Sequence, residues 1–290
     1  MTGDLPPLAA TLVLPVWARA RYGELGPERA DPHADALLAR LGADTRAMEA
    51  SLGTYGVLAL GRRAAWIDAQ VHAWGAAHPD GCVLNLGAGL DTPGRRLSTD
   101  MPLGRGDIPP QRPPPGVGPR HVHVDLPEVI ALRRALLPEH PHDTLVAARL
   151  EDPASTDALP PGTPACVVLA GVSMYLPRSV LEDLLDRLRT RAGRGSVLLL
   201  DTYAPLAAWL TNRMIAWTGL TEAPVHAGAR AAIAARVRAG TLRLRAEADP
   251  LAAPLPDGPD AWTRTQVAFA RAVGFSRLHA CDLSPTGAEA

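Results

Sequence analysis

A short glycine-rich turn is the first feature of this 290-residue sequence that could do chemistry. The segment Asn85-Leu-Gly-Ala-Gly-Leu-Asp91 follows an apolar run that is typical of a buried strand. Glycines permit a sharp turn and let a ligand approach the backbone closely. A nicotinamide-binding fingerprint would place a third glycine where this chain has Thr92, and the Lys-Ser/Thr ending of a phosphate-binding loop is absent. The turn therefore favours a ligand without phosphates over a pyrophosphate.

Asp125, which ends the next predicted strand, is the second candidate. An acid in this position of a nucleotide-binding fold accepts hydrogen bonds from both hydroxyls of a ribose. Its separation from Gly89 exceeds the usual spacing of about 20 residues. The stretch from Pro102 to Pro119 is rich in Pro and Gly and accounts for the surplus as an exposed insertion. Asp125 could instead cap the helix that begins at Pro127, and the two roles are compatible.

The elements that must position these residues alternate between strands and helices. Such alternation indicates a parallel sheet with helices on both faces. The helical segments between the strands lie near 127–137 and 178–191. Apolar runs predict the strands, which are 82–86, 121–125, 165–170 and 196–201, with further strand character at 241–245 and after Phe275.

Four regions follow from these patterns. Before the first strand, Asp31 and Pro32 mark a helix start, and Ile67, Val71 and Trp74 lie on one face of a helix over 62–78. The predicted regions are an N-terminal helical cover over 1–80, a Rossmann-like core over 81–205 with the insertion at 98–119, a helical substrate cover over 206–260, and a terminal helix and strand over 261–290.

Composition narrows the class of protein. Hydrophobic residues make up 47% of the chain, enough for a sizeable core, and the net charge of -1 gives no large basic surface for nucleic acid. The start of the chain is a poor signal peptide, and no apolar stretch approaches membrane-spanning length. Cys82, Cys166 and Cys281 lie far apart, which fits a reduced, cytoplasmic setting without a disulfide framework. Cys82 and Cys166 lie in apolar runs and are predicted to be buried. The spacing of His and acidic residues predicts no metal site.

Several segments, taken in order, resemble the leucine carboxyl methyltransferase family, and most closely its bacterial branch similar to polyketide O-methyltransferases. No single segment is specific, but together they cover roughly residues 12–202. Residues 203–290 match poorly. The matching segments are Leu14-Pro-Val-Trp-Ala-Arg-Ala20, Asp31-Pro-His-Ala34, Arg63 with Asp68, His78 to Thr92, Val124 to Arg133, and Gly171-Val-Ser-Met-Tyr-Leu176.

The resemblance implies a class I S-adenosylmethionine-dependent methyltransferase with a seven-stranded, mostly parallel sheet. It places Arg19 and Arg63 at the methionine carboxylate, which suits a planar guanidinium. The same resemblance puts Asp125 at the ribose and Gly171 to Leu176 beside the methyl-transfer site. The remaining cofactor contacts it implies are Gly87, Ala88 and Gly89 under the methionine and ribose, Arg149 and Leu150 near the adenine, and Ala170 next to the ammonium.

Three departures from the family pattern concern this cofactor. Ala170 stands where the family has a Glu that faces the cofactor ammonium, Pro93 stands where it has Arg, and Arg149 replaces an acid near the adenine. Losing one charged hydrogen bond costs about 1.5–3 kcal/mol, roughly ten-fold or more in affinity. A catalytically degenerate relative that acts as a binding module is therefore the alternative to an active enzyme.

The expected activity is O-methylation of a small-molecule acceptor, with polyketide biosynthesis as the setting that the resemblance suggests. A carboxylate acceptor, with a pKa near ~4, is ionised at neutral pH and needs no general base. A phenol acceptor more often needs one, and Tyr175 and His226 are weak candidates. No catalytic residue is assigned, and a nicotinamide oxidoreductase is disfavoured by Thr92. The sequence does not name the acceptor or the oligomeric state.

Overall fold

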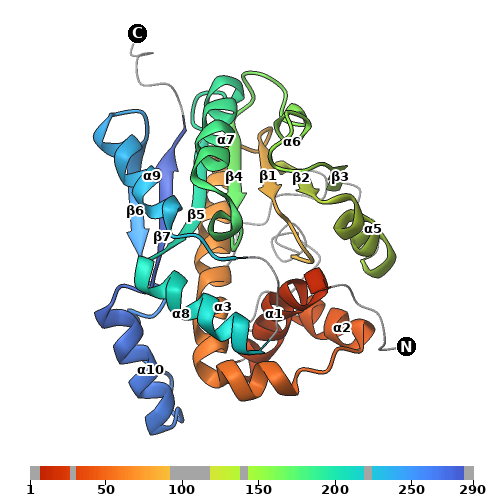
Figure 1. Ribbon diagram of the computed structural model, residues 1–290. Coiled ribbons are helices and arrows are strands. Elements are labelled where there is room, and N and C mark those ends of the chain that lie inside the picture. The colour runs from red at the N-terminus through yellow and green to blue at the C-terminus, as the bar shows by residue number, and fades with distance from the viewer. Residues whose placement is uncertain (1–6, 27–30, 92–117, 138–142, 219–223, 284–290) are drawn as a thin grey trace.

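In the computed structural model the chain folds around one seven-stranded sheet with the strand order β3-β2-β1-β4-β5-β7-β6 (Figure 1). The structure describes residues 7–26, 31–91, 118–137, 143–218 and 224–283. β1 to β5 are mutually parallel, whereas β7 runs antiparallel to both β5 and β6. The strands are β1 (Cys82–Leu86), β2 (Arg120–Asp125), β3 (Asp143–Ala147), β4 (Ala165–Leu169), β5 (Val197–Tyr203), β6 (Arg243–Ala248) and β7 (Ser276–Asp282).

The predicted α/β fold, with a mostly parallel sheet, is confirmed. Every predicted strand is present, although the one expected at 241–245 begins two residues later as β6. β3 was missed by the sequence patterns. It is an edge strand whose residues are exposed or only half-buried, so it lacks the continuous apolar run that marks a central strand.

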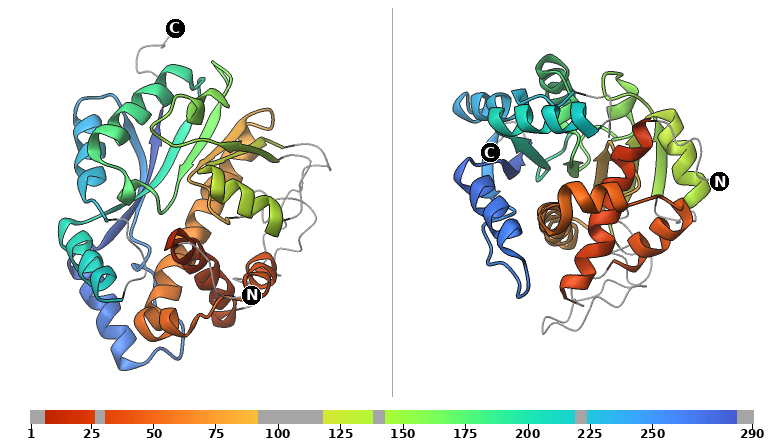
Figure 2. Two further views of the ribbon diagram at one scale, coloured as in Figure 1. Left: turned by 45° about the vertical axis from the view of Figure 1, so that its right-hand side comes forward. Right: turned by 60° about the horizontal axis from the view of Figure 1, so that its bottom comes forward.

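Helices cover both faces of the sheet (Figure 2). Leu84 and Leu86 of β1 pack in a core cluster with α7 (Arg178–Arg191) and α9 (Gly228–Arg238). Val83 points to the opposite face and packs against α3 (Arg46–Ala77). Successive strand residues point to opposite faces, so this alternation requires apolar residues on both sides of β1.

The N-terminal helices lie below the carboxyl ends of the parallel strands (Figure 1). α1 (Pro7–Tyr22) and α2 (Pro32–Leu41) share a core cluster with Leu90, which follows β1. The predicted start of α2 is confirmed, since the Asp31 side chain accepts a hydrogen bond from the Ala34 N–H at 3.0 Å. α3 is longer than predicted, and Gly53 interrupts its helical geometry.

Residues 206–260, predicted as a helical substrate cover, contain β6 as well as helices. Most of the Pro- and Gly-rich stretch from Pro102 to Pro119 lies outside the described residues, as do Thr92 and Pro93. The remaining helices are η1 (Gly23–Leu25), α5 (Pro127–Leu136), α6 (Ala154–Asp157), η3 (Ser173–Tyr175), α8 (Pro205–Thr218) and α10 (Ala261–Ala272). Within the described parts of the chain, no helix combines the length and apolar character needed to cross a membrane.

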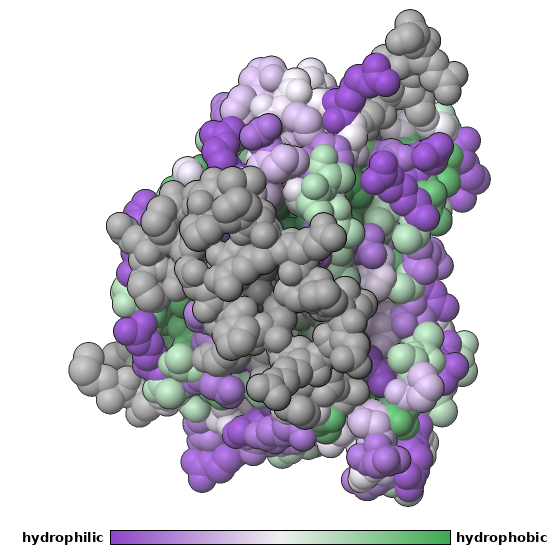
Figure 3. Space-filling model, turned by 180° about the vertical axis from the view of Figure 1, so that it is seen from behind, coloured by the Kyte–Doolittle hydropathy of each residue, from purple (hydrophilic) through white to green (hydrophobic). Residues whose placement is uncertain are grey.

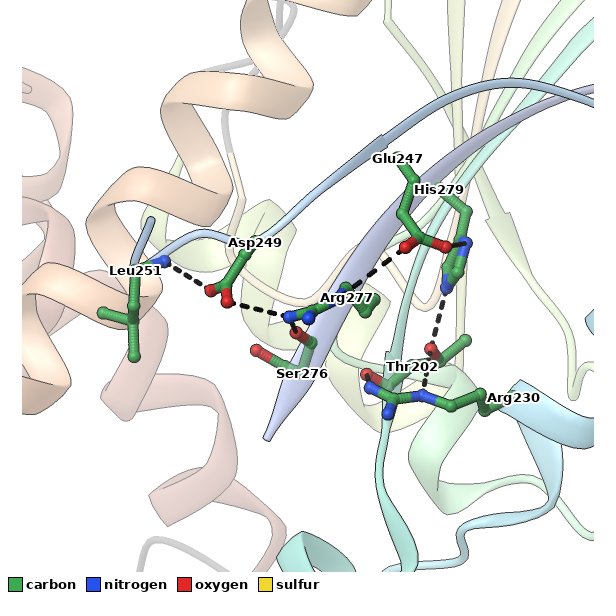
Figure 4. A network of polar contacts seen from close by, with 8 residues as sticks. All are labelled: Thr202, Arg230, Glu247, Asp249, Leu251, Ser276, Arg277 and His279. Atoms are coloured by element: carbon green, nitrogen blue, oxygen red, sulfur yellow. Dashed lines mark hydrogen bonds and ion pairs between the residues drawn. The ribbon is translucent and has the colours of Figure 1, made fainter. Parts of the chain in front are cut away.

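The antiparallel end of the sheet is joined by a polar network (Figure 4). His279 on β7 lies 2.9 Å from the Thr202 hydroxyl of β5 and 3.3 Å from the Glu247 carboxylate of β6. Arg277 pairs with Asp249 at 2.8 Å. Seen from behind, the molecule carries hydrophilic residues around its rim, with smaller hydrophobic areas between them (Figure 3).

Candidate active site

A cavity of about 360 Å³ opens at the carboxyl ends of β1, β2, β3 and β4. Parallel α/β sheets bind ligands at this edge because the strand-to-helix turns meet there. The cavity wall includes residues of α1, of α3 and of the segments that follow these four strands, which lie far apart in sequence. Every residue predicted to contact the cofactor lines it, and so does the catalytic candidate: Arg19, Arg63, Gly87, Ala88, Gly89, Asp125, Arg149, Leu150, Ala170 and Tyr175.

The turn after β1 has the conformation that its glycines predict. Gly87 and Gly89 have φ of 64° and 52°, a region that side chains with a Cβ rarely adopt. A Cβ on Gly87 would also lie 2.4 Å from Cγ2 of Val172. The Gly87 N–H donates to the Val124 carbonyl at 2.8 Å, which holds the turn against β2. The backbone of this turn forms part of the cavity wall.

Asp125 holds the same turn from the end of β2. One carboxylate oxygen accepts from the Gly89 N–H at 2.6 Å and the other from the Leu126 N–H at 2.7 Å. Burial raises the pKa of Asp125, although both hydrogen bonds oppose the shift. A carboxylate has about four lone-pair sites, so these bonds leave capacity for a ligand. The alternative role as a cap of α5 is not seen, because the N-cap residue is Leu126 and it makes no side-chain cap.

Arg19 lies buried at the N-terminal side of the cavity. Its guanidinium pairs with Asp31, 3.2 Å from Nε, and with Asp91 through Nη1. The Arg19 side chain is 6% exposed and that of Asp91 25% exposed. Asp91 also lines the cavity. A positive and a negative side chain thus stand together where a ligand that carries both charges could bind.

Arg63 on α3 lines the same cavity and pairs with Asp201. Its Nη1 is 3.0 Å from Oδ2 of Asp201, and the two side chains are 11% and 1% exposed. The Gly171 N–H donates to the second Asp201 oxygen at 2.7 Å. Burial opposes the charge of Arg63, but Asp201 together with Tyr203 and Asp91 outweighs it, so the pKa of Arg63 lies above its ordinary value. Arg63 therefore stays cationic next to the cavity.

Asp91 and Asp201 were not assigned a role from the sequence. Asp91 closes the glycine-rich segment, and Asp201 is the last residue of the strand predicted at 196–201 and lies within β5. The available signal was positional, because an acid at the carboxyl edge of a parallel sheet lies beside the other strand ends. Pairing with Arg19 and Arg63 could be found only from the structure.

A second cavity, of about 320 Å³, adjoins the first. The two share a wall that includes Arg63, Met174, Tyr175 and Tyr203. Most of its other residues are apolar and come from α3, α8, α10 and the start of β7. They are Leu14, Met48, Leu52, Gly56, Ala59, Leu60, Leu210, Pro250, Phe269, Ala270, Phe275 and Leu278, with Ser51, Tyr55, Asp201, Thr211, Gln266 and Ser276 as polar members.

Tyr175 stands on the shared wall, but its chemistry does not favour a general base. Burial raises its pKa, and the nearby Arg63 only partly offsets the shift. The phenol therefore stays protonated at neutral pH and can donate a hydrogen bond. His226, the other weak candidate, lines neither cavity.

Arg149 and Leu150 line the predicted adenine end of the first cavity. Leu150 is buried there, whereas Arg149 is exposed and lies 3.8 Å from Glu151. Glu151 also lines the cavity, so an acid is present close to the position where the family pattern has one. Among the described residues, no group of His, Cys, Asp and Glu is arranged to hold a metal ion.

Comparison with known proteins identifies relatives for part of the chain and for its fold. No family model matches the sequence, so the leucine carboxyl methyltransferase family stays a prediction. The tetracenomycin polyketide synthesis O-methyltransferase TcmP of Streptomyces glaucescens is 30% identical over 136 residues. That alignment spans 47% of this chain and 44% of TcmP, so it covers less than half of the relative.

Solved structures match almost the whole fold. A protein of Thermobifida fusca YX, provisionally assigned as a methyltransferase, aligns with a TM-score of 0.53 and 17% identity over 96% of this chain and 98% of that one. Geranyl diphosphate methyltransferase in complex with SAM gives a TM-score of 0.52 and 15% identity over 86% and 94%. This chain therefore has the Rossmann-like fold of class I methyltransferases and is homologous, over about half its length, to the O-methyltransferase TcmP.

Proposed function

We propose that the chain is an S-adenosylmethionine-dependent O-methyltransferase acting on a small-molecule acceptor. The observation that carries this proposal is the convergence of all the expected cofactor residues on one cavity with a second cavity beside it. The homology to TcmP and the class I fold support the same activity. We include a polyketide-like acceptor in the proposal, and the similarity to TcmP is the only support for it.

The residues around the first cavity fit the charges of this cofactor. Its methionine part carries a carboxylate and an ammonium, and a buried unpaired charge is expensive. We assign the carboxylate to Arg19 and Arg63, whose guanidinium groups line the cavity. Asp91 would take the ammonium, which supplies the acid that is missing at Ala170.

The rest of the cavity suits the nucleoside. Asp125 has lone pairs left for the ribose diol and is fixed by two backbone hydrogen bonds. Gly87 and Gly89 line the cavity, so the ligand would lie beside their backbone. Leu150 provides an apolar contact for the adenine.

The methyl group would cross from the first cavity to the second beside Met174 and Tyr175. The cofactor supplies a methyl sulfonium, whose carbon bonds to the acceptor oxygen while the C–S bond electrons stay on sulfur. A carboxylate acceptor brings no proton, whereas a hydroxyl acceptor releases its proton to water. The protein's part is to align the two ligands, and orientation can be worth about 7–11 kcal/mol.

Calorimetric titration with S-adenosylhomocysteine tests the proposal directly. We expect binding at one site per chain, together with a rise in melting temperature, because a ligand that binds only the folded state stabilises it. Heat and thermal shift should both be weak for adenosine, which has neither amino-acid charge. If S-adenosylhomocysteine gave neither signal, the degenerate binding module would be the better description.

A further inference from the structure

We infer that the second cavity accepts an uncharged, hydroxyl-bearing apolar molecule in preference to a carboxylate. The inference rests on the proposed methyltransferase function and narrows its substrate class. It follows from the charges around the second cavity, from the way the Arg63–Asp201 pair is held, and from the apolar remainder of the wall.

The wall offers an acceptor anion no unengaged positive charge. Among the described residues that line the second cavity, Arg63 is the only cation. Asp201 lines the same cavity and lies 3.0 Å from Arg63. The two charges cancel, so the wall carries no net positive charge toward an acceptor.

Asp201 is also fixed in place. Its Oδ1 accepts from the Gly171 N–H at 2.7 Å, and its Oδ2 lies 3.4 Å from the Tyr203 hydroxyl. The Ser173 hydroxyl donates to the Asp201 main-chain carbonyl. An acceptor carboxylate would compete with this buried aspartate for Arg63, and leaving either anion buried and unpaired is strongly unfavourable.

Arg63 has a second proposed partner on its other side. It lines both cavities, and its guanidinium packs against Gly171, where a Cβ would lie 2.9 Å from Nη1. Asp201 and the cofactor carboxylate would therefore share this one guanidinium. An acceptor carboxylate would be a third anion on the same cation.

The remaining polar groups of the wall are neutral and suit a hydroxyl or carbonyl. Burial raises the pKa of Tyr55 to about 12, and Asp249 adds to the shift, so its phenol stays protonated. Gln266 is an amide on α10. Phe269 on the same helix lines the cavity and is 49% exposed, which gives an aromatic surface to an apolar ring.

A matched pair of probes separates the two acceptor classes. With the protein saturated by S-adenosylhomocysteine, we would titrate β-naphthol and β-naphthoate at neutral pH, where the first is neutral and the second is an anion. We expect β-naphthol to bind at least about ten-fold more tightly. Equal or tighter binding of β-naphthoate would overturn the inference while leaving the proposed function intact. Absence of S-adenosylhomocysteine binding would instead count against the proposed function.

Two variants of wall residues and one control variant test whether the preference comes from the second cavity. Gln266→Arg adds a cation at the second cavity and should raise β-naphthoate affinity without raising that of β-naphthol. Gln70→Arg adds the same charge on α3 outside both cavities and should change neither. Ala59→Phe should fill the second cavity and weaken the binding of β-naphthol, while S-adenosylhomocysteine should still bind. Unchanged β-naphthol affinity in folded Ala59→Phe would place the probe elsewhere and contradict the inference.

Discussion

Arg63 and Asp201 are separated by 138 positions in sequence, yet their side chains lie 3.0 Å apart beside the wall that divides the two cavities. One residue comes from the helix before the first strand and the other from β5. The pair therefore joins the N-terminal cover to the sheet at the place where methyl transfer is proposed.

Replacing Arg63 should weaken cofactor binding and lower the stability of the fold. In Arg63→Ala we expect S-adenosylhomocysteine to lose about 1.5–3 kcal/mol of binding free energy, with a smaller loss for adenosine, which has no carboxylate. Asp201 would be left buried and unpaired, so the free energy of unfolding should fall by about 3–5 kcal/mol. Calorimetry and urea denaturation measure the two effects. Arg62→Ala is the matched control, because Arg62 lines neither cavity. Equal losses for both ligands would rule out the carboxylate assignment.

The ribose assignment depends on Asp125. Asp125→Asn keeps the size of the side chain but removes the charge that the diol hydroxyls would meet, so S-adenosylhomocysteine affinity should fall by roughly 1–3 kcal/mol. Circular dichroism should find the fold retained. Glu128→Gln removes a nearby exposed charge outside the cavity and should have no effect. An unchanged affinity in Asp125→Asn would refute the assignment.

Cofactor binding should protect the N-terminal helix from proteolysis through Arg19. The Arg19 side chain joins α1 to Asp91 after β1, and both residues line the first cavity. S-adenosylhomocysteine should therefore slow cleavage within residues 10–25 of the wild type, and less so in Arg19→Ala. Arg21→Ala is the control, since Arg21 is 39% exposed and pairs with Glu24 and Glu49 instead. Identical protection in the Arg19 variant and the wild type would contradict this coupling.

The three cysteines should be unreactive in the folded protein. Each is 0% exposed, and burial raises the pKa of Cys82 to about 11 and that of Cys281 to about 12. Because the thiolate is the reactive form, Ellman's reagent should label none of them in buffer and all of them in urea. Ser51→Cys adds a thiol at an exposed position, which should react at once, so this variant serves as the positive control of the assay. Rapid labelling of the wild type would mean that the core opens readily.

Acid should destabilise the fold in part through His279. Burial lowers the pKa of His279 below its ordinary value of 6.5, and Arg230 adds to this, although Glu247 opposes it. The folded ring is therefore neutral while the unfolded ring gains a proton below about pH 6.5, so the free energy of unfolding falls as pH drops through that range. Urea denaturation should find that acid lowers the free energy of unfolding less in His279→Gln than in the wild type. His72→Gln changes an exposed histidine and should keep the wild-type slope.

The sequence by itself determined the class of fold and the glycine-rich turn that lines the first cavity. Fully buried strands such as β1 and β4 have continuous apolar runs, and the turn after β1 requires glycines. Both features can be predicted because each depends only on residues that are neighbours in the sequence. The edge strand β3 could not be predicted in this way, because its residues are exposed or half-buried and do not form a continuous apolar run.

Only the tertiary structure decided which charges meet. Arg63 with Asp201, and Arg19 with Asp91, are pairs between segments far apart in the chain, and spacing carries no signal for such contacts. The second cavity is likewise a product of packing. Its wall combines residues of α3, α8, α10 and β7. Of the described residues in 206–260, which were predicted to form the substrate cover, only Leu210, Thr211 and Pro250 line this cavity. Which faces of these helices meet depends on how they pack around the sheet, so the second cavity could not be predicted from a local pattern.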